Sequence, residues 1–209
     1  MSQYLYTIDN RNNTMPLPIV IEVVKTEVKS TKPYDFRKLY DALHDYIYVE
    51  SYTDEGDSDP GFPEKYYWES RSQNKGTEYW IWWRCKKRVH GNQLFKRAID
   101  LDIHGVAVKE KEIMYGGKRV KIHNGKFELI IRGKLEIDHD AKWRNSMLGF
   151  LFEIFWKRIW RKELTGYRKE VVADVMKLQD FARNFMGMPT VAKRPELFYP
   201  KLGYEQENF

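Results

Sequence analysis

Apolar and charged residues alternate along the middle third of the chain. Between Lys126 and Asp138 the odd-numbered positions are mostly apolar and the even-numbered positions are mostly charged. This alternation is typical of a β-strand with one face in the core and the other in water. The apolar positions are Phe127, Leu129, Ile131, Leu135 and Ile137, and the charged ones are Lys126, Glu128, Arg132, Lys134, Glu136 and Asp138.

Two glycine-containing pairs predict hairpin turns before this strand. Asn124-Gly125 suits a two-residue turn because both residues tolerate positive φ, and Gly116-Gly117 predicts an earlier turn. Both turns bring apolar residues opposite apolar residues, with a charge ladder on the other face. With the strands before them, they predict a meander of about five antiparallel strands. The first turn opposes Ile122 with Phe127, Val120 with Leu129 and Lys121 with Glu128, and the earlier turn opposes Ile113 with Val120 and Glu112 with Lys121.

The stretch YWIWWRCKKR, from Tyr79 to Arg88, joins aromatic and cationic residues in one segment. A turn at HGNQ places Trp83 and Cys85 on the core face, so we expect Cys85 to pack rather than to act as a nucleophile. A second turn at QNKG places aromatic residues of two strands on the opposite face. The first turn opposes Ile81 with Ile103, Trp83 with Leu101, Arg84 with Asp100 and Cys85 with Ile99, and the second opposes Tyr66 with Trp82 and Trp68 with Trp80.

Strand and helix patterns also flank this meander. The β-branched segment from Pro18 to Ser30 predicts a first strand, and Pro33 precedes an amphipathic helix. An apolar helix is expected from Met147 to Trp160, and a long helix after Gly166. Residues 1–188 therefore form one predicted α+β domain, followed by an extended tail over 189–209. The first helix presents Phe36, Leu39, Tyr40, Leu43 and Ile47 on one face, and the last presents Val171, Val175, Leu178, Ala182 and Phe185.

This layout resembles the START-like, or helix-grip, superfamily, which includes polyketide cyclases and other SRPBCC-type ligand carriers. The segments that carry the resemblance are IEVVKTEVKSTKPYDFRKLYDAL at the front, and FELIIRGKLEIDHDAKW with DVMKLQDFARNFM at the back. The resemblance implies a curved antiparallel sheet packed on a long C-terminal helix. It also implies an apolar ligand between sheet and helix, with or without catalysis, and it carries no fixed catalytic residues.

Composition narrows the functional classes. The 209 residues carry a formal net charge of +6, which permits an anionic partner without requiring one. A single cysteine suits a reducing compartment, and the start of the chain lacks the apolar core of a signal peptide. No apolar run has the length of a membrane span. We therefore expect a cytoplasmic protein without a transmembrane segment.

The first functional hypothesis is a non-enzymatic protein that binds an apolar or lipid-like small molecule. The ligand would lie between the sheet and the last helix, where Gly133 interrupts the apolar row and predicts a local void. No cofactor and no catalytic residue is expected, although a cyclase- or hydrolase-type enzyme of the same superfamily remains an alternative. The expected ligand-binding residues are Ile81, Trp83, Ile131, Gly133, Leu135, Val175 and Leu178.

The second hypothesis is an RNA- or ribosome-associated protein. The face opposite the core would offer aromatic rings for base stacking beside a basic margin. Alternatively, the tail around Phe198 or a second subunit covers this face, which leaves a homodimer open. The expected nucleic-acid-binding residues are Trp80, Trp82, Arg84, Lys86 and Arg88.

Four other clusters have both a functional and a structural explanation. We prefer the structural explanation for three of them and give both equal weight for the fourth, around Trp156 and Trp160. Asp100, Asp102 and His104 share one strand face and are a metal trio in principle, although Arg84 opposes Asp100. In DHDAKW, Asp138, His139 and Asp140 could serve in acid–base chemistry. We prefer that Asp140 caps the following helix and that the other two residues are solvated. The acidic loop around Asp54, Glu55, Asp57 and Asp59 lacks EF-hand spacing. Trp156 and Trp160, flanked by lysine and arginine, suit either an anionic surface such as a membrane interface or a core helix.

Overall fold

The computed structural model describes residues 19–52, 63–115, 118–138, 143, 149–154 and 158–188. Five strands and a long C-terminal helix make it an α+β fold, as the sequence predicted. None of the described helices is long and apolar enough to cross a membrane. The elements are β1 (Ile19–Ser30), α1 (Phe36–Val49), β2 (Glu64–Ser72), β3 (Gly76–Val89), β4 (Asn92–Tyr115), β5 (Lys118–Ile137), α2 (Gly149–Ile154) and α3 (Arg161–Phe185).

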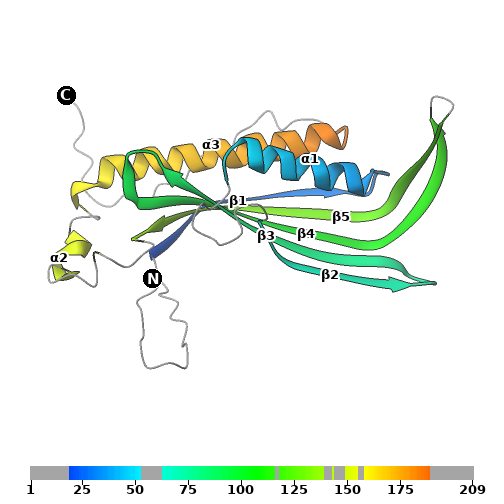
Figure 1. Ribbon diagram of the computed structural model, residues 1–209, viewed down its shortest axis with the longest axis horizontal. Coiled ribbons are helices and arrows are strands. Elements are labelled where there is room, and N and C mark those ends of the chain that lie inside the picture. Colours follow the sequence, from blue (N-terminus) through cyan, green and yellow to red (C-terminus); the bar gives the residue numbers. More distant parts are fainter. Residues whose placement is uncertain are drawn as a thin grey trace, which may run out of the picture.

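The five strands form one open antiparallel sheet in the order β1-β5-β4-β3-β2. The first strand therefore lies beside the last, and β2 forms the opposite edge. Figure 1 shows α1 and α3 side by side on one face of the sheet, while the β4–β5 hairpin curls toward that face at one end. This arrangement confirms the predicted antiparallel sheet with a C-terminal helix across it.

The registers predicted from alternation are confirmed for β2, β3 and β4. Trp83 lies opposite Leu101, and Cys85 opposite Ile99, as the turn at HGNQ requires. Tyr66 lies opposite Trp82 and Trp68 opposite Trp80. The pairings Glu112–Lys121 and Ile113–Val120 are also present between β4 and β5.

The predicted turn at Asn124-Gly125 is wrong, because both residues lie inside the continuous strand β5. Phe127 pairs with Gly105 instead of Ile122, Leu129 pairs with Ile103, and Lys121 does not pair with Glu128. A Cβ on Gly125 would lie 2.8 Å from Val108 Cα. Gly125 therefore permits a close approach of two strands rather than a reversal of the chain, and the meander has four strands, not five.

A β-bulge at Ala107 explains where the hairpin bends. Ala107 has a φ of 54°, and the registers of β4 against both β3 and β5 shift at this point. An extra residue in one strand increases the local bend and twist of a sheet. The bulge thus separates a flat part of the sheet, covered by the helices, from a curled part that extends beyond them (Figure 1).

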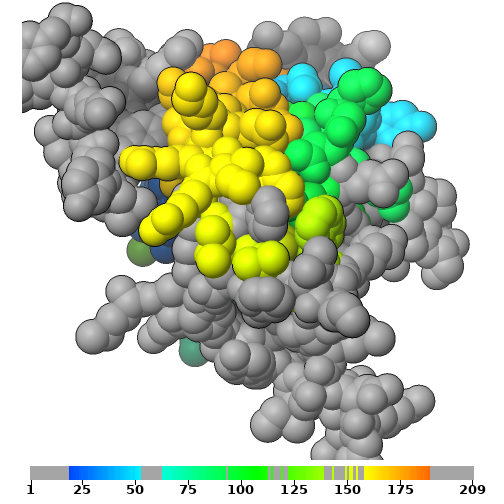
Figure 2. Space-filling view, turned by 90° about the vertical axis from the view of Figure 1, so that its left-hand side faces the viewer, coloured from blue at the N-terminus to red at the C-terminus, as the bar shows by residue number. Residues whose placement is uncertain are grey.

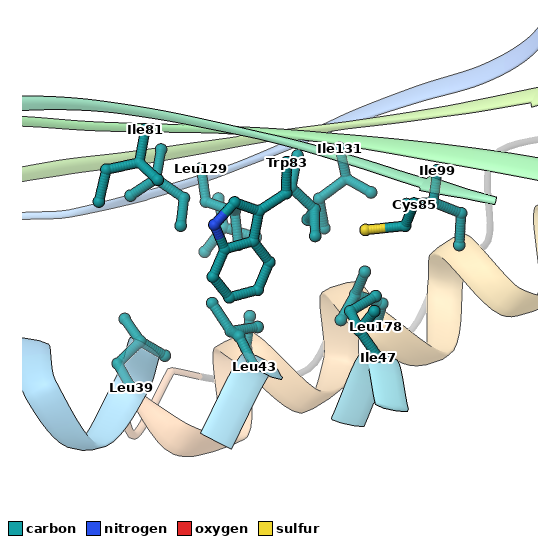
Figure 3. Packing of buried hydrophobic residues seen from close by; sticks show 14 of the residues in the cluster. Leu39, Leu43, Ile47, Ile81, Trp83, Cys85, Ile99, Leu129, Ile131 and Leu178 are labelled. Carbon is teal, nitrogen blue, oxygen red and sulfur yellow. The ribbon is translucent and has the colours of Figure 1, made fainter. Parts of the chain in front are cut away.

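The main core lies between the flat part of the sheet and the two long helices. Trp83 points from β3 toward Leu39 and Leu43 of α1, with Cys85 and Leu178 nearby (Figure 3). The α1 residues recur at helical spacing, and Asp35 caps the helix by accepting the backbone N–H of Lys38 at 3.2 Å. Burial raises the pKa of the Cys85 thiol, which agrees with its predicted packing role.

A second apolar cluster lies at the other end of the molecule. Phe95 of β4 and Phe152 of α2 pack there with Leu164 of α3. Figure 2 shows the start of α3, in yellow, beside the green β3–β4 hairpin. This cluster anchors the N-terminal half of α3.

The C-terminal helices differ from the prediction in two respects. The long helix α3 begins at Arg161 and continues through Gly166, rather than starting after it. The described parts of the expected apolar helix are the short α2, in which Phe152 is buried but Ile154 is 52% exposed, and residues 158–160, where Ile159 is 61% exposed. One face of α2 therefore supplies the core contact, so its apolar residues are not all buried.

Candidate functional site

The interface between sheet and α3, where a ligand was expected, is densely packed. A Cβ on Gly133 would lie 2.7 Å from Val171 Cγ1 and 2.8 Å from both Val175 Cγ2 and Val24 Cγ1. The predicted void over Gly133 is therefore wrong, because valines of α3 and β1 fill that space. The other expected ligand-binding residues are all 0% exposed, namely Ile81, Trp83, Ile131, Leu135, Val175 and Leu178.

A cleft of about 1250 Å³ lies elsewhere, between the first turns of α1 and the curled end of the sheet. Five elements contribute to it, and its position beyond the N-terminus of α1 follows from the bulge at Ala107. Its volume slightly exceeds that of typical small-molecule pockets, roughly 300–1,000 Å³. The lining residues are Asp35, Phe36, Arg37, Lys38, Tyr40, Asp41, Glu64, Tyr67, Glu69, Arg71, Thr77, Tyr79, Val108, Glu110, Arg119 and His123.

Aromatic side chains form part of the cleft wall. Phe36 and Tyr79 have ring centroids 4.3 Å apart, and Phe36 and Tyr40 have centroids 6.1 Å apart. The Tyr79 ring covers Gly105 so closely that a Cβ there would lie 2.1 Å from the ring. Gly105 thus makes room for the ring, which packs across the strand pair instead of extending into solvent.

The hydroxyl groups of Tyr34 and Tyr79 hydrogen-bond to each other beside the cleft. Both residues are buried, at 5% and 3% exposure, and burial raises the pKa of Tyr34 to about 12 and also raises that of Tyr79. Both hydroxyls are therefore protonated near neutral pH. One proton is used within the pair, and no other described residue accepts the second from either hydroxyl. When Tyr34 donates to Tyr79, the second proton lies on Tyr79, which lines the cleft, and that proton is then available to a bound acceptor.

His123 ties the start of α1 to the cleft. Its backbone exchanges two hydrogen bonds with Tyr34, at 2.9 and 2.7 Å. Its Nδ1 accepts the backbone N–H of Phe36 at 3.3 Å, so the neutral ring carries its proton on Nε2. His123 therefore fixes the first helical residue and the neighbouring tyrosine relative to β5.

Charged groups of both signs surround the aromatic wall. Tyr40 donates its hydroxyl proton to Glu64 at 2.7 Å. Glu69 accepts hydrogen bonds from Arg71 Nε at 2.7 Å and from the Tyr67 hydroxyl at 3.1 Å. The pKa of Glu69 is lowered, mainly by the hydrogen bond from Arg71. The mixed charge favours a ligand with both apolar and polar parts rather than a plain hydrocarbon.

Sequence reasoning did not identify this cleft. The alternation of β3 places Tyr79 on the core face, but nothing local marks it as the partner of Tyr34. The bulge at Ala107 was also not predicted, and without it the distant residues of β4 and β5 do not curl toward α1. The cleft depends on five segments that only the fold brings together.

The opposite face of the sheet carries the four predicted aromatic residues. Tyr66, Trp68, Trp80 and Trp82 are 37–41% exposed, on the two neighbouring strands β2 and β3. The Tyr66 and Trp82 rings have centroids 4.5 Å apart. Trp80 stacks on His104 with centroids 3.5 Å apart. The four rings thus lie exposed on one face of two neighbouring strands.

The basic margin of this face is extensively paired with carboxylates. Arg84 lies 2.8 Å from Asp102 and 3.7 Å from Asp100, and its guanidinium lies 5.8 Å from the centre of the Trp82 ring. Lys86 pairs with Glu136 at 3.1 Å. Arg88 is exposed. These ion pairs reduce the positive potential that the sequence suggested.

The three residues of the proposed metal site, Asp100, Asp102 and His104, are already engaged in ion pairs and hydrogen bonds. Asp100 and Asp102 face cations on β3 and β5, including Lys134 at 2.5 Å from Asp100, and His104 Nε2 lies 3.1 Å from Glu78. Among the described residues, no group of three or more histidine, cysteine, aspartate or glutamate side chains could hold a metal ion.

The remaining predicted clusters are only partly within the described residues. Asp138, expected to be solvated, is buried at 3% exposure and accepts the Trp143 N–H at 3.2 Å. This expectation was wrong because Asp138 closes the end of the sheet, where its own N–H binds the Leu94 carbonyl at 2.8 Å. Outside the described residues lie His139, Asp140, the acidic loop from Asp54 to Asp59, Trp156, and the tail with Phe198.

Comparison of the chain with protein-family models, with curated proteins and with solved structures found no match. The helix-grip resemblance therefore stays a prediction, and the functional argument depends on the geometry of the cleft and the aromatic face.

Proposed function

We propose that the protein is a non-enzymatic binding protein that holds a small amphipathic molecule in the cleft beside α1. The proposal keeps the binding role expected from the sequence but moves the ligand away from the sheet–α3 interface. The packing of Val171 and Val175 on Gly133 supports this change, since it leaves no space for a ligand between the sheet and α3 at that point. The helix-grip resemblance remains part of the proposal, because β1 lies beside β5 and α3 follows β5.

The observation that carries the proposal is the buried Tyr34–Tyr79 hydroxyl pair at an aromatic-lined cleft. A buried hydroxyl proton without an acceptor is costly, and an acceptor on a ligand removes that cost. We therefore expect a ligand with an apolar or aromatic body against Phe36 and Tyr79. It would also carry an oxygen acceptor, such as a carbonyl or carboxylate, that reaches Tyr79.

Titration with the fluorescent dye 8-anilinonaphthalene-1-sulfonate tests the location of this site. The dye combines aromatic rings with anionic oxygen atoms, so it should bind the wild-type cleft with enhanced fluorescence. Thr77→Trp places an indole in the cleft and should abolish the enhancement. Trp80→Ala removes a ring on the opposite face and should leave it unchanged. Loss of binding in Trp80→Ala with retention in Thr77→Trp would assign the dye to the wrong face and refute the proposal.

Single-stranded RNA binding on the outer sheet face is the second candidate function. Four half-exposed rings on adjacent strands favour it, because base stacking on such rings contributes about 1–3 kcal/mol per base. The ion pairs of Arg84 and Lys86 weigh against it, since a nucleic acid needs positive charge that is not already neutralised.

Tryptophan fluorescence with single-stranded RNA at two salt concentrations distinguishes this candidate from the first. RNA binding requires quenching that weakens as salt rises and that disappears in a Trp80→Ala/Trp82→Ala double variant. A flat response at low salt removes this function and leaves the cleft proposal unaffected.

A further inference from the structure

The cleft beside α1 has an acidic lining, although the chain as a whole is basic. The chain carries a formal net charge of +6, but carboxylates outnumber lysines and arginines among the lining residues. Charges that line a cleft attract ligands of the opposite sign. The lining therefore favours a cation over an anion. Its acidic residues are Asp35, Asp41, Glu64, Glu69 and Glu110, and its basic ones are Arg37, Lys38, Arg71 and Arg119.

Glu64 differs from the other lining carboxylates because it is half-buried and forms no ion pair with a described residue. Its side chain accepts the Tyr40 hydroxyl at 2.7 Å, which is a neutral partner. A carboxylate that is withdrawn from water without a cation beside it is unfavourable, and a ligand cation would offset that cost. The other four have a partner or lie in solvent: Asp35 with Lys38 at 3.2 Å, Glu69 with Arg71 at 2.7 Å, Glu110 with His123 at 3.9 Å, and Asp41 exposed.

Two tyrosines of the cleft wall lie close to this carboxylate. Tyr40 of α1 bonds to Glu64 directly, and Tyr67 follows Glu64 on β2 and also lines the cleft. Burial raises the pKa of both tyrosines most, and neighbouring carboxylates, Glu64 among them in each case, raise it further. The face of an aromatic ring attracts an ammonium group within about 6 Å. The rings and the carboxylate together therefore suit a bound cation.

Glu64 and the hydroxyl donor Tyr79 lie at separate places along the cleft wall. Glu64 pairs with Trp83, which is four residues beyond Tyr79 along β3. Phe36 lies near both Tyr79 and Tyr40, with ring centroids 4.3 and 6.1 Å away. Aromatic surface thus connects an end of the cleft that suits an oxygen acceptor with an end that suits a cation.

We infer that the ligand of the cleft is an organic ammonium compound whose protonated amine binds Glu64 between the rings of Tyr40 and Tyr67. The inference rests on the proposed binding function of the cleft and adds the chemical class of the ligand. The apolar body of the ligand lies against Phe36, and its oxygen acceptor reaches Tyr79. Hydrogen bonds between an amine and a carboxylate are about twice as strong as neutral ones, so Glu64 determines the preference for a cation.

Two dansyl probes that differ in charge test this assignment by fluorescence anisotropy. Monodansylcadaverine has a naphthalene ring, sulfonamide oxygens and a terminal ammonium group, and its N-acetyl derivative has a neutral amide in place of that ammonium. The wild-type chain should bind the amine roughly tenfold more tightly than the N-acetyl derivative. Glu64→Gln keeps an acceptor for Tyr40, so it should weaken binding of the amine roughly tenfold and leave the N-acetyl derivative unchanged. Glu22→Gln removes an exposed carboxylate of β1 as the matched control and should change neither.

Equal dissociation constants of the two probes in the wild-type chain would overturn the inference. Loss of both probes in Glu64→Gln, with a native circular dichroism spectrum, would overturn it as well. The cleft proposal survives either result if Thr77→Trp abolishes the binding that the wild-type chain shows. If neither probe binds the wild-type chain, the inference is wrong, and if 8-anilinonaphthalene-1-sulfonate also fails to bind, the cleft proposal is wrong too.

Discussion

Gly133 of β5 lies directly beneath Val171 of α3, where a Cβ on the glycine would meet the valine Cγ1 at 2.7 Å. This contact allows α3 to approach the sheet closely. It also explains why the apolar row of β5 is interrupted by a glycine without leaving a cavity. A glycine in the apolar row of β5 would leave a void only if α3 packed at the usual distance from the sheet.

Gly133→Ala should therefore destabilise the protein by about 1–3 kcal/mol, because the added methyl group overpacks a core of three valines. The free energy of unfolding in urea measures the effect. Gly166→Ala is the matched control in α3, since nothing lies within 4 Å of its Cβ position. It should stabilise the helix by about 0.5–1 kcal/mol. A stabilising Gly133→Ala would indicate an empty space after all.

Removing the hydroxyls of Tyr34 and Tyr79, singly and together, should show that the two groups stabilise each other. Tyr79→Phe leaves the buried Tyr34 hydroxyl without its partner and should cost about 1–3 kcal/mol, with a similar cost for Tyr34→Phe. The double variant should cost less than the sum, with a coupling of about 0.5–3 kcal/mol in a double-mutant cycle. Strictly additive costs would mean that the two hydroxyls do not interact.

The buried tyrosines should make stability fall at high pH. Burial raises the pKa of Tyr34 and of Tyr46 from 10 to about 12, and also raises that of Tyr52 and Tyr79. Unfolded tyrosines release protons near pH 10, while the folded ones retain theirs, so the stabilisation is complete below pH 10 and is lost as pH rises toward 12. Urea midpoints across this range, with tyrosinate absorbance, measure it. Complete titration of the folded protein near pH 10 would contradict the burial of these hydroxyls.

Asp174 joins α3 to β4 and to Tyr52, which follows α1, and should be a sensitive position. Its Oδ2 accepts from the Tyr52 hydroxyl at 2.6 Å and lies 3.2 Å from Arg97 of β4. Asp174→Ala leaves both groups without this partner in a mostly buried site, and should cost about 3 kcal/mol of unfolding free energy. Glu170→Ala removes the more exposed partner of Arg97, at 3.0 Å, and should cost less than about 1 kcal/mol. Equal losses would mean that burial does not distinguish the two carboxylates.

The flat part of the sheet could be predicted from the sequence because its registers depend on alternation. Trp83 opposite Leu101 and Tyr66 opposite Trp82 follow from period-two patterns with a turn between them. The turn at Asn124-Gly125 could not be rejected locally, because the same pair also suits a close strand contact. Long-range pairing of Phe127 with Gly105 overrides the local preference.

The candidate site was harder to predict than the fold. Tyr34 and Tyr79 are 45 residues apart, and their contact requires both the tie between Tyr34 and His123 and the space over Gly105. The aromatic face was predictable because its four residues lie on adjacent strands in a register set by one turn. Its ion pairs with Asp100 and Asp102 were only partly predictable, because Arg84 reaches both.

Native mass spectrometry of the wild-type chain and of Thr77→Trp, both purified from the protein's own cells, tests the cleft assignment most directly. We predict that the wild-type chain retains a small molecule and that the variant, folded by circular dichroism, carries none. Ligand-free wild-type protein, or the same bound mass in both chains, would contradict the assignment of the cleft as the binding site.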